Sequence, residues 1–398
     1  MCFSINHKNV ILIIYVTYYQ YNMLTSHSKE TVVVGMSGGV DSSVSALLLK
    51  QQGYRVMGMF MKNWEEKDAD GICQSALEYE DVVRVCQQLD IPYYSVNFIQ
   101  EYWDNVFAHF LAEFKLGHTP NPDILCNREI KFKVLLDKAL EVGGDYLATG
   151  HYCRKELRDD LWQLLKGSDP AKDQSYFLYT IGQRALSKVL FPVGDMVKTD
   201  LRNLAHEHRL ATSAKKDSTG ICFIGKRDFK EFLGKYLAYT PGEFQTLEGK
   251  AVGEHSGVAY YTPGQRKGMG IGGPGEPWFV VGKDVTQNVV YLAQGQRHPA
   301  LYCDELTATE ASWVSGRPPT TLHCRSKVRY RQPDQECEIT RIDNGRLHVR
   351  FAIPQRAVTS RQSIVFYDGD VCLGGAMIEN PGLSYYHQGK ELPSIVAP

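Results

Sequence analysis

Short apolar runs alternate with amphipathic stretches over the first half of the chain. Residues 31–34 are a β-branched run, which is typical of a strand buried on both faces. Residues 40–52 then repeat apolar positions at helical spacing, and Gly53 ends this helix. The same patterns predict strands at 55–61, 93–98 and 146–149, and helices at 78–89 and 103–116. Strands that alternate with helices predict a parallel sheet that is covered on both faces.

The pattern changes after about residue 225, where helical periodicity fades and short strands with Gly and Pro turns take over. We therefore expect an α/β protein in which a parallel-sheet domain at 31–223 is followed by two β-rich parts. The first is a small central domain at 224–298, and the second is a C-terminal β-barrel at 299–382 with a tail at 383–398.

Residues 1–30 precede the first strand and look separate from the rest. The apolar stretch 10–19 is too short to cross a bilayer as a helix. It also lacks the small-x-small cleavage site of a secretory signal. We interpret the segment as a disordered extension or a mis-called start with Met23 as the initiator, and we expect no membrane association.

Composition narrows the class of protein. The 398-residue chain has a formal net charge of −1, so no overall field attracts nucleic acid. Ten cysteines occur without a CxxC pair, which argues against a zinc ribbon, an iron–sulfur cluster and a thioredoxin-like site. A chain of this size needs no disulfide framework, so a reducing cytoplasm is the expected location.

A local basic excess lies in the second half. Residues 313–361 contain ten Arg and Lys against four Asp and Glu, so this region can attract nucleic acid although the whole chain does not. Arg325, Lys327, Arg329 and Arg331 alternate, which predicts that they share one face of a strand. The alternative is an ordinary solvated face.

A phosphate-binding loop is the strongest chemical signal. Ser37-Gly38-Gly39 separates the first strand from the first helix, and glycines allow a sharp turn with close approach to the backbone. Unpaired N–H groups and the helix N-terminus then suit a phosphate or pyrophosphate. The string is neither a Walker A motif nor GxGxxG. SGGVDSS instead resembles the loop of enzymes that cleave ATP to AMP and pyrophosphate, and Asp41 is the carboxylate expected to help hold magnesium.

Two cysteines interrupt the strand–helix rhythm. Cys126 ends an extended, proline-containing loop just before a helix that we expect to open at Glu129, so its pKa would be lowered beside Arg128. The alternative is a buried structural cysteine. Cys222 lies in a glycine-flanked apolar segment and, taken alone, would belong to the core. Two loop cysteines beside an adenylating site suggest sulfur transfer, because one can carry a persulfide and the other resolve it.

From Thr31 to about Glu379 the chain resembles the tRNA-specific 2-thiouridylase family. The matching strings are GMSGGVDSS, FMKNWEE, TPNPDILCN, ATGHY, KDQSYFLY, KKDSTGICFIG, GQRKGMGIGG, KVRYRQ and VCLGGAMI. The resemblance implies an adenine nucleotide α-hydrolase-like domain, a small central domain and a tRNA-binding β-barrel. It also implies ATP and Mg²⁺ as cofactors, tRNA as substrate, and sulfur supplied by a cysteine desulfurase directly or through sulfur-relay proteins.

The resemblance assigns roles residue by residue. It makes Cys126 the nucleophile, Cys222 the persulfide carrier and Asp123 a candidate general acid or base, and it implies a Cys126–Cys222 disulfide after each turnover. The implied ATP-binding residues are Gly35, Met36, Ser37, Gly38, Gly39, Val40, Asp41, Ser42, Met61 and Gly150. The implied tRNA-binding residues are Asn121, Pro122, Asp123, His151, Lys172, Asp173, Gln174, Arg329, Tyr330 and Gln362.

One stretch departs from the family pattern. The family usually reads VTPGQ where this chain has Val358-Thr359-Ser360-Arg361-Gln362. If the position of Arg361 needs a positive φ, a side chain there is strained.

Two other functions are compatible with parts of the sequence. A ligase-like ATP pyrophosphatase acting on a small molecule would share SGGVDSS but would need neither cysteine nor the basic strand. A non-catalytic tRNA-binding protein would have no reason to keep the loop, its aspartate and both cysteines.

Overall fold

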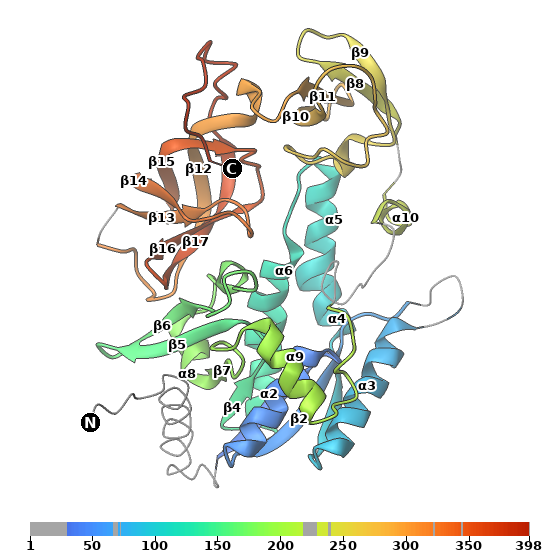
Figure 1. The fold of residues 1–398 in the computed structure, drawn as a ribbon, viewed down its shortest axis with the longest axis vertical. Helices are drawn as coiled ribbons and strands as arrows, with labels where there is room; N and C mark the ends of the chain where they lie inside the picture. The colour runs from blue at the N-terminus through green and yellow to red at the C-terminus, as the bar shows by residue number, and fades with distance from the viewer. Residues whose placement is uncertain are drawn as a thin grey trace, which may run out of the picture.

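The computed structural model describes residues 30–66, 71, 73–217, 229–237, 240–320, 323–343 and 345–397. Figure 1 shows the parallel-sheet domain at one end of the molecule and the β-barrel and the central domain side by side at the other. The predictions for residues 1–29 and for Cys222 lie outside the described residues.

The predicted parallel sheet is confirmed. Five strands lie in the order β3-β2-β1-β4-β7, and every neighbouring pair is parallel. Their bounds are β1 Thr31–Met36, β2 Arg55–Lys62, β3 Tyr93–Asn97, β4 Tyr146–Ala148 and β7 Val189–Leu190. Val32, Val33 and Val34 in β1 are fully buried, as a central strand with both faces covered requires.

Helices cover the two faces of this sheet. Val32 and Val34 pack on one face in a core with α2 (Val40–Gln51), α3 (Gln74–Gln88) and α9 (Lys198–Glu207). Val33 points to the other face, where two long helical runs lie. The first run is α4 (Ile99–Tyr102), the π-helix η1 (Trp103–Phe107) and α5 (Ala108–Lys115). The second run is α6 (Pro122–Leu125), the π-helix η2 (Cys126–Leu135) and α7 (Leu136–Glu141).

The helix expected to open at Glu129 begins at Pro122 instead, so that prediction was wrong. Asn121 is its N-cap, and the Asn121 Oδ1 accepts from the Asp123 N–H at 3.1 Å. Proline is favoured at the first helical position because its missing N–H would be unpaired there. Cys126 therefore lies inside a helix and not at the end of an extended loop.

A hairpin that the sequence analysis did not predict joins the first domain to the barrel. It consists of β5 (Cys153–Arg158) and β6 (Leu161–Lys166), and β6 pairs with β17 of the barrel sheet. The remaining helices are short, and they are η3 Ser175–Phe177, α8 Gln183–Lys188, α10 Phe229–Gly234, η4 Val258–Tyr260 and η5 Pro299–Leu301.

The two β-rich parts have the expected architecture. The central sheet has the order β10-β11-β8-β9, with bounds β8 Gly242–Thr246, β9 Ala251–His255, β10 Trp278–Asp284 and β11 Val289–Gln294. The barrel strands are β12 Tyr302–Trp313, β13 His323–Lys327, β14 Gln335–Asp343, β15 Arg346–Arg356, β16 Ser363–Asp368 and β17 Val371–Pro381. Because β12 pairs with both β15 and β17, the six strands close into a barrel.

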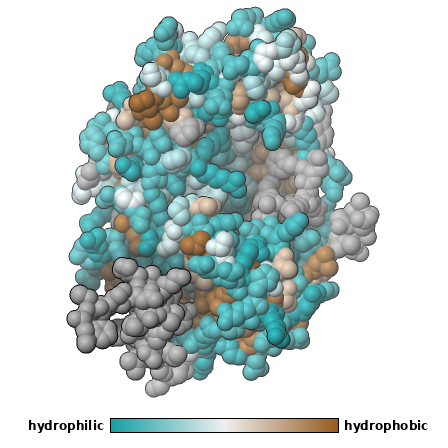
Figure 2. Space-filling view, viewed as in Figure 1, coloured by the Kyte–Doolittle hydropathy of each residue, from teal (hydrophilic) through white to brown (hydrophobic). Residues whose placement is uncertain are grey.

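The face of the molecule in Figure 2 is mainly hydrophilic, with small scattered apolar patches. Among the described helices, none combines the length and the apolar character needed to cross a membrane.

Candidate active site

The glycine-rich loop lies where β1 ends and α2 begins. Gly38 has a φ of +71°, and a Cβ at this position would lie 2.6 Å from the Glu78 carbonyl oxygen. Ser42 Oγ donates to the Gly39 carbonyl at 3.1 Å and lies 3.3 Å from Ser37 Oγ. Gly39 occupies the N-cap of α2 and has no side chain with which to cap the first turn. The loop therefore leaves helix N–H groups open to an anion at the carboxyl end of a parallel strand.

A cavity of about 420 Å³ opens against this loop. Every predicted ATP-binding residue except Gly38 lines it, including Met61 from β2 and Gly150 after β4. A Cβ on Gly150 would lie 2.8 Å from the backbone N of Ser42. Glycine at 150 thus lets the chain after β4 pack directly against the start of α2.

Asp41 is the centre of a charged network on the cavity wall. Its Oδ1 accepts from Lys198 Nζ at 2.6 Å and from the Tyr152 hydroxyl at 2.8 Å. Burial, together with the charge of Asp41, raises the pKa of Tyr152, so its hydroxyl stays a donor. The sequence analysis gave Tyr152 no role although it ends the matching string ATGHY, and it missed Lys198, which lies in none of the matching strings.

Asp217 extends this network along the cavity wall. It accepts from Lys172 Nζ at 2.7 Å and pairs with Lys198 Nζ at 3.0 Å. Partial burial alone would raise the pKa of Asp217, but the hydrogen bonds and charges of the two lysines lower it to about 2. Asp217 is therefore ionised at neutral pH and holds both lysines beside the cavity.

The side chains at the cavity that could bind a metal fit magnesium only together with phosphate oxygens. Across the described residues, no three His, Cys, Asp or Glu side chains are close enough to form a metal site by themselves. Mg²⁺ in nucleotide sites is commonly held by one or two carboxylates plus the phosphates. Asp41 lines the cavity next to the glycine loop and fits that role.

The start of the α6–η2 helix forms the opposite side of the cavity. Asp123 and Asn127 line the cavity, whereas Asn121 and Pro122 form the helix start beside it. Asn127 Nδ2 donates to the Phe177 carbonyl at 3.1 Å, and its buried Oδ1 has no hydrogen-bond partner within the described part of the chain. Cys126 is fully buried in the core next to these residues.

His151 lies at the base of the cavity. Its Nε2 is 3.5 Å from Lys131 Nζ, and its Nδ1 is 2.8 Å from Thr149 Oγ1. A lysine ammonium can only donate, so Nε2 accepts and the Nδ1–H donates to Thr149. Burial, and then the charge of Lys131, lower the pKa of His151 well below its ordinary value.

The predicted tRNA-contact residues at 172–174 have different surroundings. Lys172 and Gln174 line the cavity, and Gln174 Oε1 also accepts from the Tyr152 N–H at 2.9 Å. Asp173 is only 4% exposed and accepts from the N–H groups of Gly167 and Ser175. Asp173 therefore orders the loop, while its neighbours face the cavity.

The prediction of one basic strand face was wrong. β13 ends at Lys327, and the chain turns before Arg329 and Arg331, so the alternation does not continue. Lys327 is largely buried and pairs with Asp173 and Asp334, each at 3.6 Å. Arg329 is partly buried, and it donates to the carbonyl groups of Pro263 and Ala357 and to Thr359 Oγ1.

The turn after β13 nevertheless contributes to the cavity. Tyr330 and Arg331 both line it. Arg331 was part of the predicted basic strand, but only the tertiary structure places it beside the nucleotide loop. The barrel therefore supplies part of the wall of this site.

The departure at 358–362 has the predicted consequence. Arg361 has a φ of +66°, a conformation that favours glycine. Its Nε lies 3.0 Å from Glu113 Oε2 on α5, and Glu113 also contacts His118 Nδ1 at 2.7 Å. Gln362 Nε2 donates to the Thr119 carbonyl. This stretch of the barrel thus contacts the segment that leads to Asn121.

Sequence comparisons agree with these features. Family models match residues 30–226 ("tRNA methyl transferase HUP domain"), 230–294 ("tRNA methyl transferase PRC-barrel domain") and 303–378 ("Aminomethyltransferase beta-barrel domain"). A protein from Protochlamydia amoebophila named tRNA-specific 2-thiouridylase MnmA is 62% identical over 92% of this chain and 98% of its own length. The chain belongs to the tRNA-specific 2-thiouridylase family.

Other 2-thiouridylases show the same extent of similarity. One from Geobacillus thermodenitrificans is 58% identical over 88% of this chain and 95% of its own length. The family inferred from the sequence motifs is therefore confirmed. Among solved structures, the U34-tRNA thiolase NcsA from Methanococcus maripaludis is 17% identical, with a TM-score of 0.35 over 56% of this chain and 74% of its own. That likeness is too weak to carry an argument about function.

Membership of the 2-thiouridylase family leaves the roles of single residues open. Those assignments stay predictions, including the pairing of Cys126 with Cys222.

Proposed function

We propose that this protein catalyses the ATP-dependent 2-thiolation of the wobble uridine of tRNA, by adenylating the C2 oxygen and transferring sulfur from a cysteine persulfide. The observation that carries the proposal is the single cavity shared by the glycine loop, Asp123 and Tyr330. A nucleotide, a base and a segment of the barrel can therefore meet at one place. A small-molecule ligase would not need the contribution of the barrel.

The proposed first step joins the uridine to the α-phosphate. The base must leave its stack for its C2 oxygen to reach the site. That oxygen attacks the α-phosphorus and pyrophosphate leaves. The C2 oxygen is a poor leaving group by itself, and as an AMP ester it becomes a good one. Mg²⁺ bound with the ATP supplies charge neutralisation on the phosphates. The open N–H groups of α2 support this step, because they would hold the departing pyrophosphate.

Asn127 is suited to recognising a uracil. Asn127 lines the cavity, and its Oδ1 is buried without a hydrogen-bond partner in the described part of the chain. A uracil offers its N3–H donor to such an acceptor, whereas the N3 of a cytosine offers only a lone pair. An acceptor left unpaired in the wrong complex costs about 1–3 kcal/mol, enough to discriminate between the two bases.

The proposed second step transfers sulfur. A cysteine desulfurase, directly or through sulfur-relay proteins, loads Cys222 as a persulfide. Attack by Cys126 on the Cys222 sulfur releases sulfide, which attacks C2 and displaces AMP. Direct attack by the terminal sulfur is the alternative route. Either way a Cys126–Cys222 disulfide remains and must be reduced, which the cytoplasm supports.

The test measures the mass of tRNA nucleosides and the release of AMP in one reaction. Unmodified tRNA is incubated with protein, ATP, magnesium and a sulfur-loading system. We expect a sulfur-for-oxygen gain on uridine, lost in Cys126→Ala and Cys222→Ala while AMP release that depends on tRNA persists. Gly150→Ala should abolish AMP release, because its Cβ would clash with Ser42. Gly182→Ala is the matched control, since a Cβ there meets nothing within 4 Å.

The outcomes separate the rival functions. AMP release without tRNA would favour a small-molecule ligase. No AMP release under any condition would favour a non-catalytic tRNA-binding protein. Thiolated uridine formed by Cys222→Ala with a protein-borne sulfur donor would overturn the proposed role of Cys222.

A further inference from the structure

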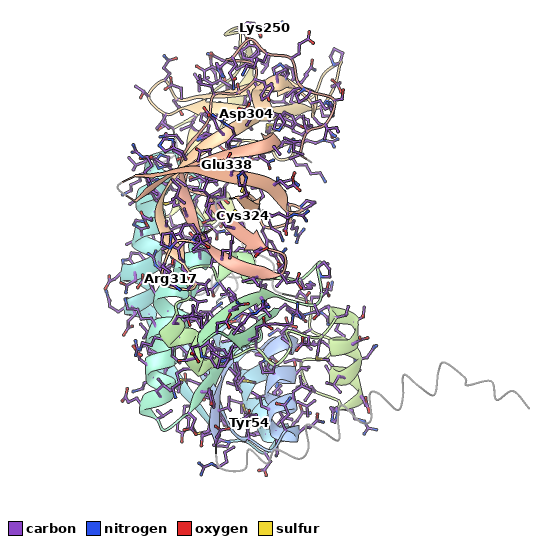
Figure 3. All side chains as sticks on the ribbon, turned by 90° about the vertical axis from the view of Figure 1, so that its left-hand side faces the viewer. Tyr54, Lys250, Asp304, Arg317, Cys324 and Glu338 are labelled. Atoms are coloured by element: carbon purple, nitrogen blue, oxygen red, sulfur yellow. The ribbon has the colours of Figure 1, made fainter. Side chains whose placement is uncertain are left out.

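A pair of cysteines lies on adjacent strands of the barrel, outside the site described above. Cys324 on β13 and Cys337 on β14 are direct partners in the antiparallel register. Their sulfur atoms are 3.7 Å apart. Figure 3 shows Cys324 on the barrel, between Glu338 and the parallel-sheet domain. Both residues are thiols, and neither takes part in the proposed sulfur transfer.

We propose that Cys324 and Cys337 form a redox-sensitive thiol pair, which a hydroperoxide oxidises to a cross-strand disulfide that locks the β13–β14 hairpin. This inference does not depend on the proposed function. It assigns a modification site to the barrel and a consequence for the segment that the hairpin carries.

The backbone geometry suits a disulfide. Disulfide-bonded cysteines have Cα atoms about 4.4–6.8 Å apart, and directly opposed residues on antiparallel strands are about 4.5–5.5 Å apart. The sulfur atoms need only move from 3.7 Å to bonding distance, which side-chain rotation can supply. Cys337 is 6% exposed, whereas Cys324 is half-buried, so an oxidant can approach the pair from the side of Cys324.

The chemistry of the pair differs from that of the lone buried cysteines. A hydrogen bond from Cys324 lowers the pKa of the Cys337 thiol, and the same contact raises the pKa of Cys324. Burial instead raises the pKa of Cys86 to about 11 and that of Cys303 to about 12. Since the thiolate is the nucleophile, Cys337 is the sulfur of this pair that ionises first.

The reaction is balanced with one hydroperoxide. One thiolate attacks a peroxide oxygen, which gives a sulfenic acid and, after proton transfer, one water. The second sulfur then attacks the sulfenic sulfur and displaces a second water. Two thiols and hydrogen peroxide therefore become one disulfide and two waters, and a dithiol reductant reverses the change.

The disulfide would act on the active-site cavity through the hairpin turn. Cys324 and Cys337 are 13 positions apart and enclose the turn that carries Tyr330 and Arg331 to the cavity. A cross-link at the base of this turn removes its open conformations and leaves the contacts at its tip in place.

The first experiment identifies the cross-link in the full-length protein. The protein is treated with hydrogen peroxide and then denatured. Its remaining free thiols are alkylated with N-ethylmaleimide, and the protein is digested with trypsin. Cleavage after Arg325 and Arg331 places the cysteines in separate peptides, 298–325 and 332–341. We expect these peptides to be joined, with the loss of two hydrogen atoms, and to separate on reduction. Recovery of both peptides unlinked, whether alkylated or overoxidised, would overturn the proposal.

Two variants make this assignment specific. Peptide 298–325 also contains Cys303, so Cys303→Ala should keep the cross-link and Cys324→Ala should abolish it. The reverse result would assign the bond to Cys303 and contradict the proposal. Both substitutions conserve a small side chain, and folding of each variant is checked by its thermal transition.

The second experiment tests the locking of the hairpin. Amide hydrogen exchange is measured over residues 328–334 in the oxidised and reduced protein. We expect about tenfold slower exchange after oxidation, because the cross-link removes locally open states. Cys324→Ala should show no such change. Equal exchange rates in the oxidised and reduced wild-type protein would refute the locking, even if the disulfide forms.

Discussion

At the scale of single residues, the cavity is built by side chains that are distant in the sequence. Asp41 belongs to the glycine loop, but Tyr152 and Lys198 fix its carboxylate from two later elements. His151 adds a buried, neutral imidazole below them. Such groups link the stability of the site to its protonation state.

His151 should make the protein sensitive to mild acid. Its pKa is lowered well below 6.5 in the folded protein, so below pH 6.5 the unfolded chain binds a proton that the folded protein does not. Stability is therefore expected to fall with decreasing pH, by up to about 1.4 kcal/mol per pH unit. His151→Gln removes the titrating group and should flatten this part of the profile. The free energy of unfolding, measured from pH 7.5 to 5, checks the difference, and parallel profiles for both proteins would contradict it.

At the scale of elements, α5 and the barrel share a contact that orders the segment before α6. Glu113 on α5 pairs with Arg361 of the barrel, and Thr119 contacts Thr262 of the central domain at 3.3 Å. Both contacts lie just before Asn121, where the helix with Asp123 begins. We infer that the placement of Asp123 depends on barrel docking.

Charge reversal tests this dependence. Arg361→Glu places two carboxylates together at a largely buried contact. It should lower the free energy of unfolding by about 2 kcal/mol or more. The φ strain stays the same, because the position keeps an L-side chain. Combining it with Glu113→Arg should restore most of the stability and of the tRNA thiolation rate. Thermal unfolding and kcat/KM for tRNA are the measurements.

An ion pair within the barrel provides the matched control. Arg346 and Glu379 are 2.6 Å apart, and the arginine side chain is 52% exposed. Arg346→Glu should cost no more than about 1 kcal/mol and leave kcat/KM unchanged. If Arg361→Glu behaves like this control, the α5–barrel contact does not position the site.

At the scale of the whole molecule, one buried cluster spans the junction between the parallel-sheet domain and the barrel, and the interior of the barrel has a further cluster around Ile339 and Phe366. Val365 and Tyr367 of β16 lie in the same buried cluster as Leu164 of β6. The Tyr176 hydroxyl donates to the Ser363 carbonyl at 2.9 Å across this junction. The central domain has a separate core around Phe244.

These cores predict the pattern of thermal unfolding. Calorimetry should show one transition shared by the parallel-sheet domain and the barrel, and a second one for the central domain. Val365→Ala should lower the free energy of unfolding of the shared transition only, and Phe244→Ala that of the second transition only. Each decrease should be about 3 kcal/mol, because both side chains are fully buried. A barrel transition that moves alone in Val365→Ala would contradict the shared core.

Local patterns predicted the parallel sheet and its phosphate loop because the responsible residues are neighbours in the chain. The β5–β6 hairpin was missed since residues 153–158 are mostly polar and their sheet is completed by β17, far away in the sequence. The start of α6 was missed because Pro120 and Pro122 suggested an extended loop, whereas Asn121 and Pro122 cap a helix. Arg329 looked like a surface residue because its carbonyl partners come from distant segments.

The sequence by itself determined the strand–helix alternation of the parallel sheet, the glycine loop and the family, because periodicity, backbone freedom and motif spacing are local properties. It also predicted strain at Arg361 if that position needs a positive φ, and the structure confirms the positive φ. Only the tertiary structure decided which charged groups surround Asp41, that Tyr330 and Arg331 reach the cavity, and that Cys324 opposes Cys337. Those features depend on contacts between segments far apart in the chain, and only packing and strand register decide which of these segments meet.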